Sequence, residues 1–417
     1  MKMNRKRFLV ISTVLMTFMF LVSGCGGSGT ATTTTTAPPT TAAPTNTQPP
    51  DTTAPAASAA PAGVPTLNAD AAKRAEEAYA FIADLRQKAS AYSTSAADYR
   101  YILNNHDPAA SAVGEFLAAW SDAVLVATEG KVFIEVGHSN SFSTSGTMAT
   151  LDEMISGSID FDFTLPCYFK GYMPLTLAIQ NAGLGIKNAT VAASAMWELY
   201  KTNADIQAEY ADDGEVMFVW ANNPSPLSYK GTAEINDISD IKGNIRGNNG
   251  PAQMFITQVG ASIFGCPIGE VYTNVSTGVM DYLITDWHGI ASFSLYDDGV
   301  LNHYLDTNIG CSAYTLMANE DVWAQIEANG YADAIKSVSG DYLLNLVGIW
   351  EAYEANGRDL ARSTGGDIYA PNSTLAGQLD GVYEAVAKQW VSETGGSAQQ
   401  VYDQTAGLVE KYAAMYK

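Results

Sequence analysis

Arg246 is the residue whose type and setting most clearly suggest binding chemistry. It lies in the stretch IKGNIRGNNG, residues 241–250, and no other arginine occurs between Arg100 and Arg358. A guanidinium group is planar, stays charged at any working pH and matches a carboxylate with two parallel hydrogen bonds. The adjacent Gly247 lets the backbone approach a ligand closely. Arg246 is therefore the first candidate for binding an anion, and a surface ion pair is the alternative.

The overall charge of the chain makes this arginine more informative. The 417 residues include 44 acidic and 22 basic side chains, which give a net charge of −22. This charge argues against a nucleic-acid partner and against broad attraction to an anionic bilayer. An anionic ligand is repelled at long range, so its binding site must be locally positive.

Polar and aromatic side chains follow several predicted strands, which is where ligands of open α/β sheets bind. Asn105 and His106 follow the first strand and precede a helix whose N-terminus favours anions, although Asn105 and Asp107 can equally well be turn and helix-cap residues. His138 follows the second strand and Tyr168 follows the third. Asn223 lies where two lobes are expected to join, either as a ligand contact or as part of a hinge turn.

Four further candidates lie in the second half of the chain. Trp287 follows a predicted strand and either stacks on the ligand or belongs to the core, and Asp286 precedes it. Asn274 lies one turn into a predicted helix and Asn248 lies two residues after Arg246. We expect all of these residues to contact a ligand. We expect no catalytic residue, no cofactor site and no metal site.

The order of predicted elements indicates an α/β protein with largely parallel sheets. Strands are expected at 100–105, 131–137, 158–166, 215–221 and 311–319, with helical stretches between them and three long helical stretches at the end. The alternation restarts after residue 221, which predicts two lobes. We expect lobe 1 to comprise 97–220 and 310–345, and lobe 2 to comprise 221–309 and 346–417.

The N-terminus predicts export. Basic residues precede an apolar run that ends in LVSGC, so 1–24 read as a signal peptide. The stretch resembles a bacterial lipobox, which implies cleavage before Cys25, a diacylglycerol on its thiol and stable anchoring in the membrane. An ordinary cleaved signal or an uncleaved anchor is the alternative. Residues 25–65 are rich in Thr, Ala and Pro and read as a disordered tether, and 66–92 as an appended helix.

The remaining cysteines give little further information. Cys167, Cys266 and Cys311 are three in number, so at most one disulfide is expected, and their spacing matches no metal-binding pattern. Free thiols are favoured.

Four stretches together resemble the DctP-type solute-binding proteins of tripartite ATP-independent periplasmic (TRAP) transporters. They read DISDIKGNIRGNNG, GASIFGCPIGEVYTNVSTGVMDYLITDW, MISGSIDFDF and GGDIYAPNSTLAGQLDGVYEAVAKQWVSE. Their order and spacing extend over roughly 97–415 of the chain. The sequence departs from the family pattern at Tyr282, where the family has glycine, so the resemblance does not determine the identity of the ligand.

The resemblance implies a two-lobe fold of the periplasmic-binding-protein type, similar to type II, with hinge strands and a long helix that braces both lobes. It implies a small carboxylate bound between the lobes and gripped by an arginine at the position of Arg246. It also implies delivery of this ligand to two membrane permease subunits of an ion-gradient-driven transporter, from an extracytoplasmic position on the bacterial cell membrane.

Three other functions remain compatible with the sequence, and one of them, a surface adhesion or structural lipoprotein, is supported by the tether alone. A binding protein of an ATP-driven importer or of a membrane sensor would have the same lobed fold. An extracytoplasmic enzyme acting on an organic acid is a further alternative, although the chain has only four histidines and lacks the G-x-S-x-G, H-E-x-x-H and P-loop motifs.

Overall fold

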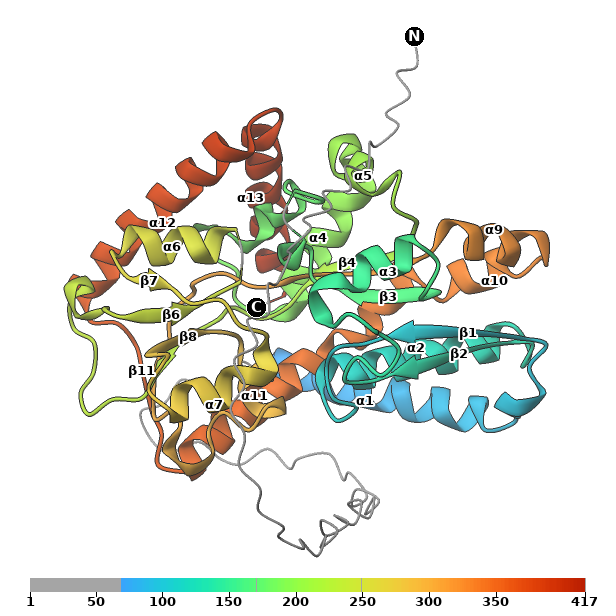
Figure 1. Cartoon of the computed structure of the whole chain (residues 1–417), viewed down its shortest axis with the longest axis horizontal. Helices are drawn as coiled ribbons and strands as arrows, with labels where there is room; N and C mark the ends of the chain where they lie inside the picture. Colours follow the sequence, from blue (N-terminus) through green and yellow to red (C-terminus); the bar gives the residue numbers. More distant parts are fainter. Residues whose placement is uncertain (1–68, 170, 249, 417) are drawn as a thin grey trace, which may run out of the picture. The chain divides into compact units, whose positions relative to one another are not determined.

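The computed structural model describes residues 69–169, 171–248 and 250–416, and these form one mixed α/β unit with two sheets (Figure 1). The predicted signal peptide, the lipidated Cys25 and the tether lie outside the described residues.

The first sheet has five strands. In spatial order they are β2 (Val132–Gly137), β1 (Tyr99–Asn104), β3 (Phe161–Thr164), β10 (Ala313–Ala318) and β4 (Glu215–Ala221). Strand β1 pairs with both neighbours in parallel, whereas β10 is antiparallel to β3 and β4. Strand β10 thus enters a sheet that the earlier part of the chain has built.

The second sheet has six short strands and is also mixed. In spatial order they are β11 (Asp367–Tyr369), β9 (His303–Leu305), β5 (Leu227–Tyr229), β8 (Tyr282–Ile284), β6 (Asn244–Arg246) and β7 (Ser262–Ile263). Strand β5 is antiparallel to β8 and β9, and the other pairs are parallel. Each sheet therefore contains one strand that follows a segment crossing from the other sheet, namely β10 in the first and β5 in the second. The spacing of apolar residues along a strand does not reveal such a crossing.

The helices cover these sheets and the segments between them. They are α1 (Ala69–Ala89), α2 (Ala112–Ala127), α3 (Thr150–Ile155), α4 (Ala189–Thr202), α5 (Ala204–Tyr210), α6 (Pro251–Gln258), α7 (Val271–Ser276), α8 (Trp287–Ser292), α9 (Glu320–Ala328), α10 (Ala332–Ser337), α11 (Gly348–Ser363), α12 (Ser373–Thr394) and α13 (Ala398–Met415). The predicted two-lobe α/β architecture is confirmed. Helix α13 packs on α4 beside the first sheet, although the sequence grouped it with lobe 2.

Two segments cross between the sheets side by side. The backbone N–H of Asn222 donates to Ser312 O at 3.1 Å, and the N–H of Ser225 donates to Gly310 O at 2.8 Å. The side-chain oxygen of Asn222 accepts from the N–H of Ser312 at 2.7 Å, and its amide donates to Tyr314 at 2.7 Å. Because Asn222 is fully buried, these bonds fix how the crossing segments run past each other.

Helix α11 braces both lobes, as the resemblance implies. On the first lobe Trp350 lies edge-on to Phe116 at 5.3 Å and to Trp220 at 6.0 Å between ring centroids. On the second lobe Gly357 lies against the backbone of Trp287 at the start of α8, where a Cβ added to the glycine would be 2.5 Å from the Trp287 carbonyl oxygen. The helices can approach this closely only because residue 357 has no side chain.

A buried aspartate lies on the first sheet. Asp162 of β3 is opposite Asn104 of β1 and is 1% exposed. Neither of its carboxyl oxygens has a hydrogen-bond partner among the described residues. Burial raises the pKa of Asp162 to about 8, although Thr150, Thr164 and Asn104 beside it lower the pKa in part. The folded protein therefore holds a proton here at neutral pH.

We predict that Gly357→Ala destabilises the protein by about 1–3 kcal/mol, because the new methyl group must push α11 away from α8. Chemical denaturation measures this change. Gly381→Ala in α12 is the matched control, since apart from its chain neighbours and the backbone of its own helix no atom lies within 4 Å of the position that a Cβ would take there. Alanine at residue 381 should be neutral or stabilising by up to about 1 kcal/mol. Equal effects of both substitutions would contradict the close packing of α11 on α8.

We predict that Asp162 makes stability fall as the pH rises. The folded state binds a proton that an unfolded aspartate releases near pH 4, so the contribution is full below about pH 4 and is lost as the pH approaches 8. Asp162→Asn keeps the shape and removes the titration. The stability difference between wild type and variant, measured by denaturation at several pH values, should fall by up to about 1.4 kcal/mol per pH unit between pH 5 and 8. A difference that is independent of pH would show that Asp162 is not protonated in the fold.

Candidate functional site

A small cavity lies between residues of the two lobes, beside the crossing segments. It is lined by His106, Asp107, Leu165, Tyr168, Arg246, Asn248, Ile268, Thr285, Asp286, His288, Gly289, Phe293, Ser312 and Tyr314. The space open to the centre of a water molecule is about 30 Å³. A ligand of more than a few heavy atoms can therefore enter only if the walls of this cavity separate.

Arg246 supplies the positive charge of the cavity. It ends β6, next to Leu283 of β8, and its side chain is 3% exposed. Its Nε donates to the carbonyl oxygen of Cys266 at 3.3 Å and its Nη2 donates to the hydroxyl of Tyr168 at 3.3 Å. Both acceptors are neutral. Tyr168 belongs to the first lobe, so this hydrogen bond joins the lobes across the cavity.

Other arginines of the chain have carboxylate partners. Those that pair within 4.0 Å of a carboxylate are Arg74, Arg100, Arg358 and Arg362. Among the described ion pairs none involves Arg246. A buried charge is stable only when it is paired and hydrogen-bonded, so an anion in the cavity would complete the environment of this guanidinium.

Two carboxylates and two histidines form the other side of the cavity. Nε2 of His288 lies 3.5 Å from Asp107 and its Nδ1 lies 3.7 Å from Asp286, while Nε2 of His106 lies 3.4 Å from Asp107. All four side chains are at least nine-tenths buried. Asp286 also caps α8 by accepting from the N–H of Gly289 at 3.2 Å, which places His288 in the first turn of that helix.

The two histidines have opposite pKa shifts. Burial lowers the pKa of His106, and nearby His288 and Arg246 lower it further against the opposing effect of Asp107. Burial also acts to lower the pKa of His288, but Asp286 and Asp107 on either side outweigh it and raise the pKa above its ordinary value. At neutral pH His106 is therefore neutral, whereas the two carboxyl groups make His288 easier to protonate than a free imidazole.

The remaining walls are aromatic and aliphatic. Tyr168 and Tyr314 come from the first lobe, and Phe293 and Ile268 come from the second. His106 stacks on Phe163 with a centroid distance of 5.2 Å and an interplanar angle of 18°, which fixes the orientation of its ring. The cavity thus combines charged groups with surfaces on which a carbon skeleton can pack.

The structure brings together five of the predicted ligand contacts. Arg246, His106, Tyr168, Asn248 and Asp286 all line the cavity. They come from the ends of strands and from the loops that follow them, as strand-end positions predict.

Trp287 and Asn274 lie away from the cavity lining. Trp287 is fully buried in the core of the second lobe, with Tyr304 at 5.1 Å between ring centroids and the Arg358 guanidinium 4.7 Å from its own ring centroid. Its side chain points away because Asp286 and His288 on either side of it face the cavity. The amide of Asn274 donates to Glu270 O at 3.0 Å, one turn back at the start of α7.

The three other predicted contacts form hydrogen bonds within a turn or between segments of the chain. They are Asn105, His138 and Asn223. The amide of Asn105 donates to Asp107 O at 3.1 Å, and its oxygen accepts from the N–H of Asp107 at 2.9 Å, so it shapes the turn that presents Asp107. His138 lies 3.1 Å from the same amide. Asn223 donates to Glu354 of α11 and so ties a crossing segment to the brace.

Several cavity residues were not predicted as ligand contacts. From the sequence, Asp107 is interpreted as a helix cap and His288 only as a neighbour of Trp287. Ser312 and Tyr314 come from the second crossing segment, whose return to the cavity no local pattern reveals. A better signal was available for Asp107 and His288, because both lie at strand ends where other candidates were named.

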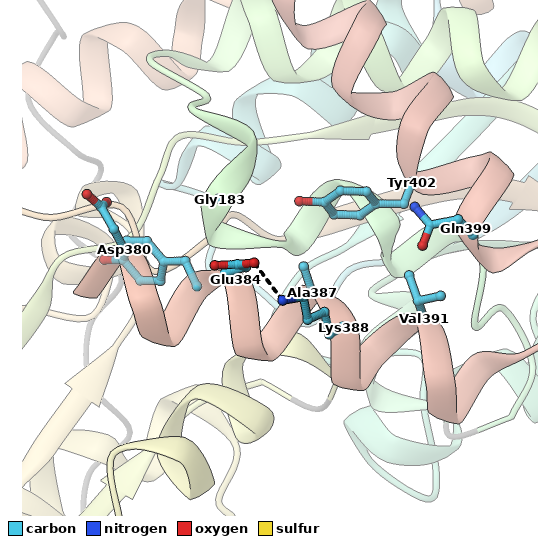
Figure 2. A pocket seen from close by; sticks show the side chains of 9 residues that line it. Gly183, Asp380, Glu384, Ala387, Lys388, Val391, Gln399 and Tyr402 are labelled. Carbon is cyan, nitrogen blue, oxygen red and sulfur yellow. Dashed lines mark hydrogen bonds and ion pairs between the residues drawn. The ribbon is translucent and has the colours of Figure 1, made fainter. Parts of the chain in front are cut away.

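A larger surface hollow of about 470 Å³ lies between α12 and α13. Figure 2 shows Glu384 and Lys388 on α12 opposite Gln399 and Tyr402 of α13. Lys388 already pairs with Glu384 at 2.6 Å, and both side chains are about 70% exposed. Asp380 lies on the same wall. An anion gains little there, because exposed pairs are weak and the unpaired charge is negative.

Cys167, Cys266 and Cys311 form no disulfide among the described residues, in agreement with the prediction. In the same part of the chain, no group of three or more His, Cys, Asp or Glu side chains is arranged to hold a metal ion. Within 69–169, 171–248 and 250–416, no helix is both long and apolar enough to cross a membrane.

Solved structures with the same fold are TRAP solute-binding proteins. One from Rhodoferax ferrireducens T118, in complex with copurified benzoate, has a TM-score of 0.69 at 20% identity and covers 76% of this chain and 99% of its own. One from Bordetella bronchiseptica with bound (R)- and (S)-mandelate has a TM-score of 0.67 at 20% identity and covers 75% and 99%. A Bordetella pertussis extracytoplasmic solute receptor binding pyroglutamic acid has a TM-score of 0.62 at 18% identity and covers 73% and 99%.

A match to a known sequence family assigns the chain to its family. The search among curated proteins gave no match. The family model described as bacterial extracellular solute-binding protein, family 7 (DctP), matches residues 103–391, which is more than half of the chain. The resemblance predicted from the four sequence stretches is thereby confirmed, and the chain belongs to family 7 of the bacterial extracellular solute-binding proteins.

Proposed function

We propose that this protein is an extracytoplasmic receptor that binds a small organic acid between its lobes and delivers it to a TRAP-type, ion-gradient-driven transporter. Membership of the family supports the receptor role, and the two permease subunits of such a transporter are the expected partners. The structural neighbours were solved with benzoate, mandelate and pyroglutamate, which are all small carboxylates. This proposal makes the protein a carrier of its ligand rather than an enzyme.

The burial of Arg246 without a described carboxylate partner carries this proposal. The two oxygens of a ligand carboxylate fit the guanidinium fork, and each charge-assisted hydrogen bond of this kind contributes about 1.5–3 kcal/mol. Exclusion of water from the closed cavity strengthens the contact.

Opening and closing of the lobes accounts for ligand entry. The cavity is too small in this conformation for a benzoate-sized acid to enter, and its walls come from both lobes. The crossing segments near Asn222 and Ser312 are the natural hinge, because they connect the lobes beside the cavity. A ligand that contacts both Arg246 and first-lobe residues such as Tyr168 favours the closed state, since only closure makes all its contacts.

We also propose that the protein is anchored to the bacterial cell membrane by lipid on Cys25. The sequence LVSGC after a basic and apolar N-terminus supports this placement. An anchored receptor with a long tether of 25–65 would stay close to its permease while remaining free to turn.

We predict that Arg246→Ala reduces the affinity for an acid ligand by at least about 100-fold, because two charge-assisted hydrogen bonds are lost. Arg246→Lys should also weaken binding, since an ammonium group cannot form the bidentate pair. Isothermal titration of benzoate, mandelate and pyroglutamate against the protein without residues 1–65 measures both effects.

Arg100→Ala is the matched control for the loss of a positive charge. Arg100 lies on β1, is exposed and pairs with Glu135 at 3.1 Å, so its removal should leave the affinity unchanged. Thermal unfolding checks that the Arg246 variants fold. Folded Arg246→Ala and Arg246→Lys proteins that bind every acid as well as wild type would refute the proposed site.

We predict that Cys25→Ser releases the full-length protein from the membrane fraction. Metabolic labelling with a radioactive fatty acid should mark the wild type and not the variant, because only a thiol receives the diacylglycerol. Cys266→Ser is the control for a general effect of losing a cysteine and should stay labelled. Labelling of the Cys25→Ser protein would contradict the lipid anchor.

A further inference from the structure

The cavity offers hydrogen-bond acceptors as well as the arginine. Asp286 is 4% exposed, and its Oδ2 has no hydrogen-bond partner among the described residues. The side-chain oxygen of Asn248 is buried and without a partner as well, while its amide donates to Ser312 at 2.9 Å. Buried acceptors without donors cost free energy, so a ligand that supplies N–H groups to them is favoured.

The cavity holds acidic groups as well as the arginine. Asp107 and Asp286 line it together with Arg246 and His288, and all of these side chains are buried. His288 lies 3.5 Å from Asp107 and 3.7 Å from Asp286, and neither of its ring nitrogens has a hydrogen-bond partner among the described residues. A monocarboxylate brings its negative charge close to these two acidic side chains, whereas a ligand that also carries a positive group offsets them.

We propose that the ligand of this receptor is a zwitterionic amino acid, whose carboxylate binds Arg246 and whose ammonium group binds Asp286 Oδ2 and the side-chain oxygen of Asn248. This inference rests on the proposed function and names the ligand class of the same site. The ammonium group has three donors and no acceptor, so it fits a surface made of two unpartnered oxygens. Asp286 is then the residue that sets specificity, and Arg246 is the residue that every acid shares.

Asp286 can both cap α8 and bind the ammonium group, because its two carboxyl oxygens have different surroundings. Its Oδ1 accepts from the N–H of Gly289 and caps α8, while its Oδ2, which lies 3.7 Å from His288 Nδ1, has no hydrogen-bond partner among the described residues. Asparagine is also a good helix cap, so Asp286→Asn keeps the cap and removes only the negative charge. This substitution separates the ligand preference from the folding of α8.

Matched ligands test the inference. The pairs are phenylglycine with mandelate and alanine with lactate, in which an ammonium group replaces a hydroxyl group on the same skeleton. Isothermal titration against the protein without residues 1–65 should give an affinity for the amino acid at least tenfold above that for the hydroxy acid in a pair that binds. In Asp286→Asn this ratio should fall at least tenfold. Asp380→Asn, at the surface hollow, controls for a general effect of charge and should keep the wild-type ratio.

The outcomes also separate this inference from the proposed function. Hydroxy acids that bind as tightly as their amino-acid partners, a ratio unchanged in Asp286→Asn, or no binding of either amino acid would overturn the zwitterionic ligand. If benzoate or mandelate then binds in a manner that requires Arg246, the receptor for organic acids still stands. Binding of acids that is indifferent to Arg246 would instead refute the proposed site itself.

Discussion

The binding site depends on a guanidinium group that is buried between the two lobes and has no ion pair with a carboxylate among the described residues. In a chain with twice as many acidic as basic residues, a partner for Arg246 would have been easy to provide, and other arginines have one. The nearest acidic groups of the cavity lie beside histidines instead. This arrangement keeps a positive charge available at a place that anions reach only from outside, and it reconciles a net charge of −22 with an anionic binding partner.

The rest of the fold serves to hold that cavity in shape. Helix α8 presents Asp286 and His288, and α11 fixes α8 through the close contact of Gly357 with the backbone of Trp287. At its other end α11 packs through Trp350 on the aromatic core of the first lobe. One helix thus contacts both lobes, and Asn223 ties a crossing segment to the same helix through Glu354.

The sequence predicted the features that depend on local pattern. The alternation of strands and helices gave the two-lobe α/β class, and the order and spacing of four stretches, one of them around Arg246, gave the family. Strand ends located Arg246, Tyr168 and Asp286. Periodicity could not reveal the antiparallel strands β5 and β10, because their direction is set by crossings that join distant segments. It also could not decide which neighbour in a loop faces inward, so Trp287 was named together with Asp286, whereas Asp286 and His288 line the cavity.

The most direct test is a crystal structure of the protein with a bound ligand, at a resolution that shows the carboxylate. We expect two carboxylate oxygens within about 3 Å of the guanidinium nitrogens of Arg246, with residues of both lobes around the carbon skeleton. A structure in which the ligand binds elsewhere, or in which Arg246 pairs with a carboxylate of the protein itself while the ligand is bound, would contradict this expectation.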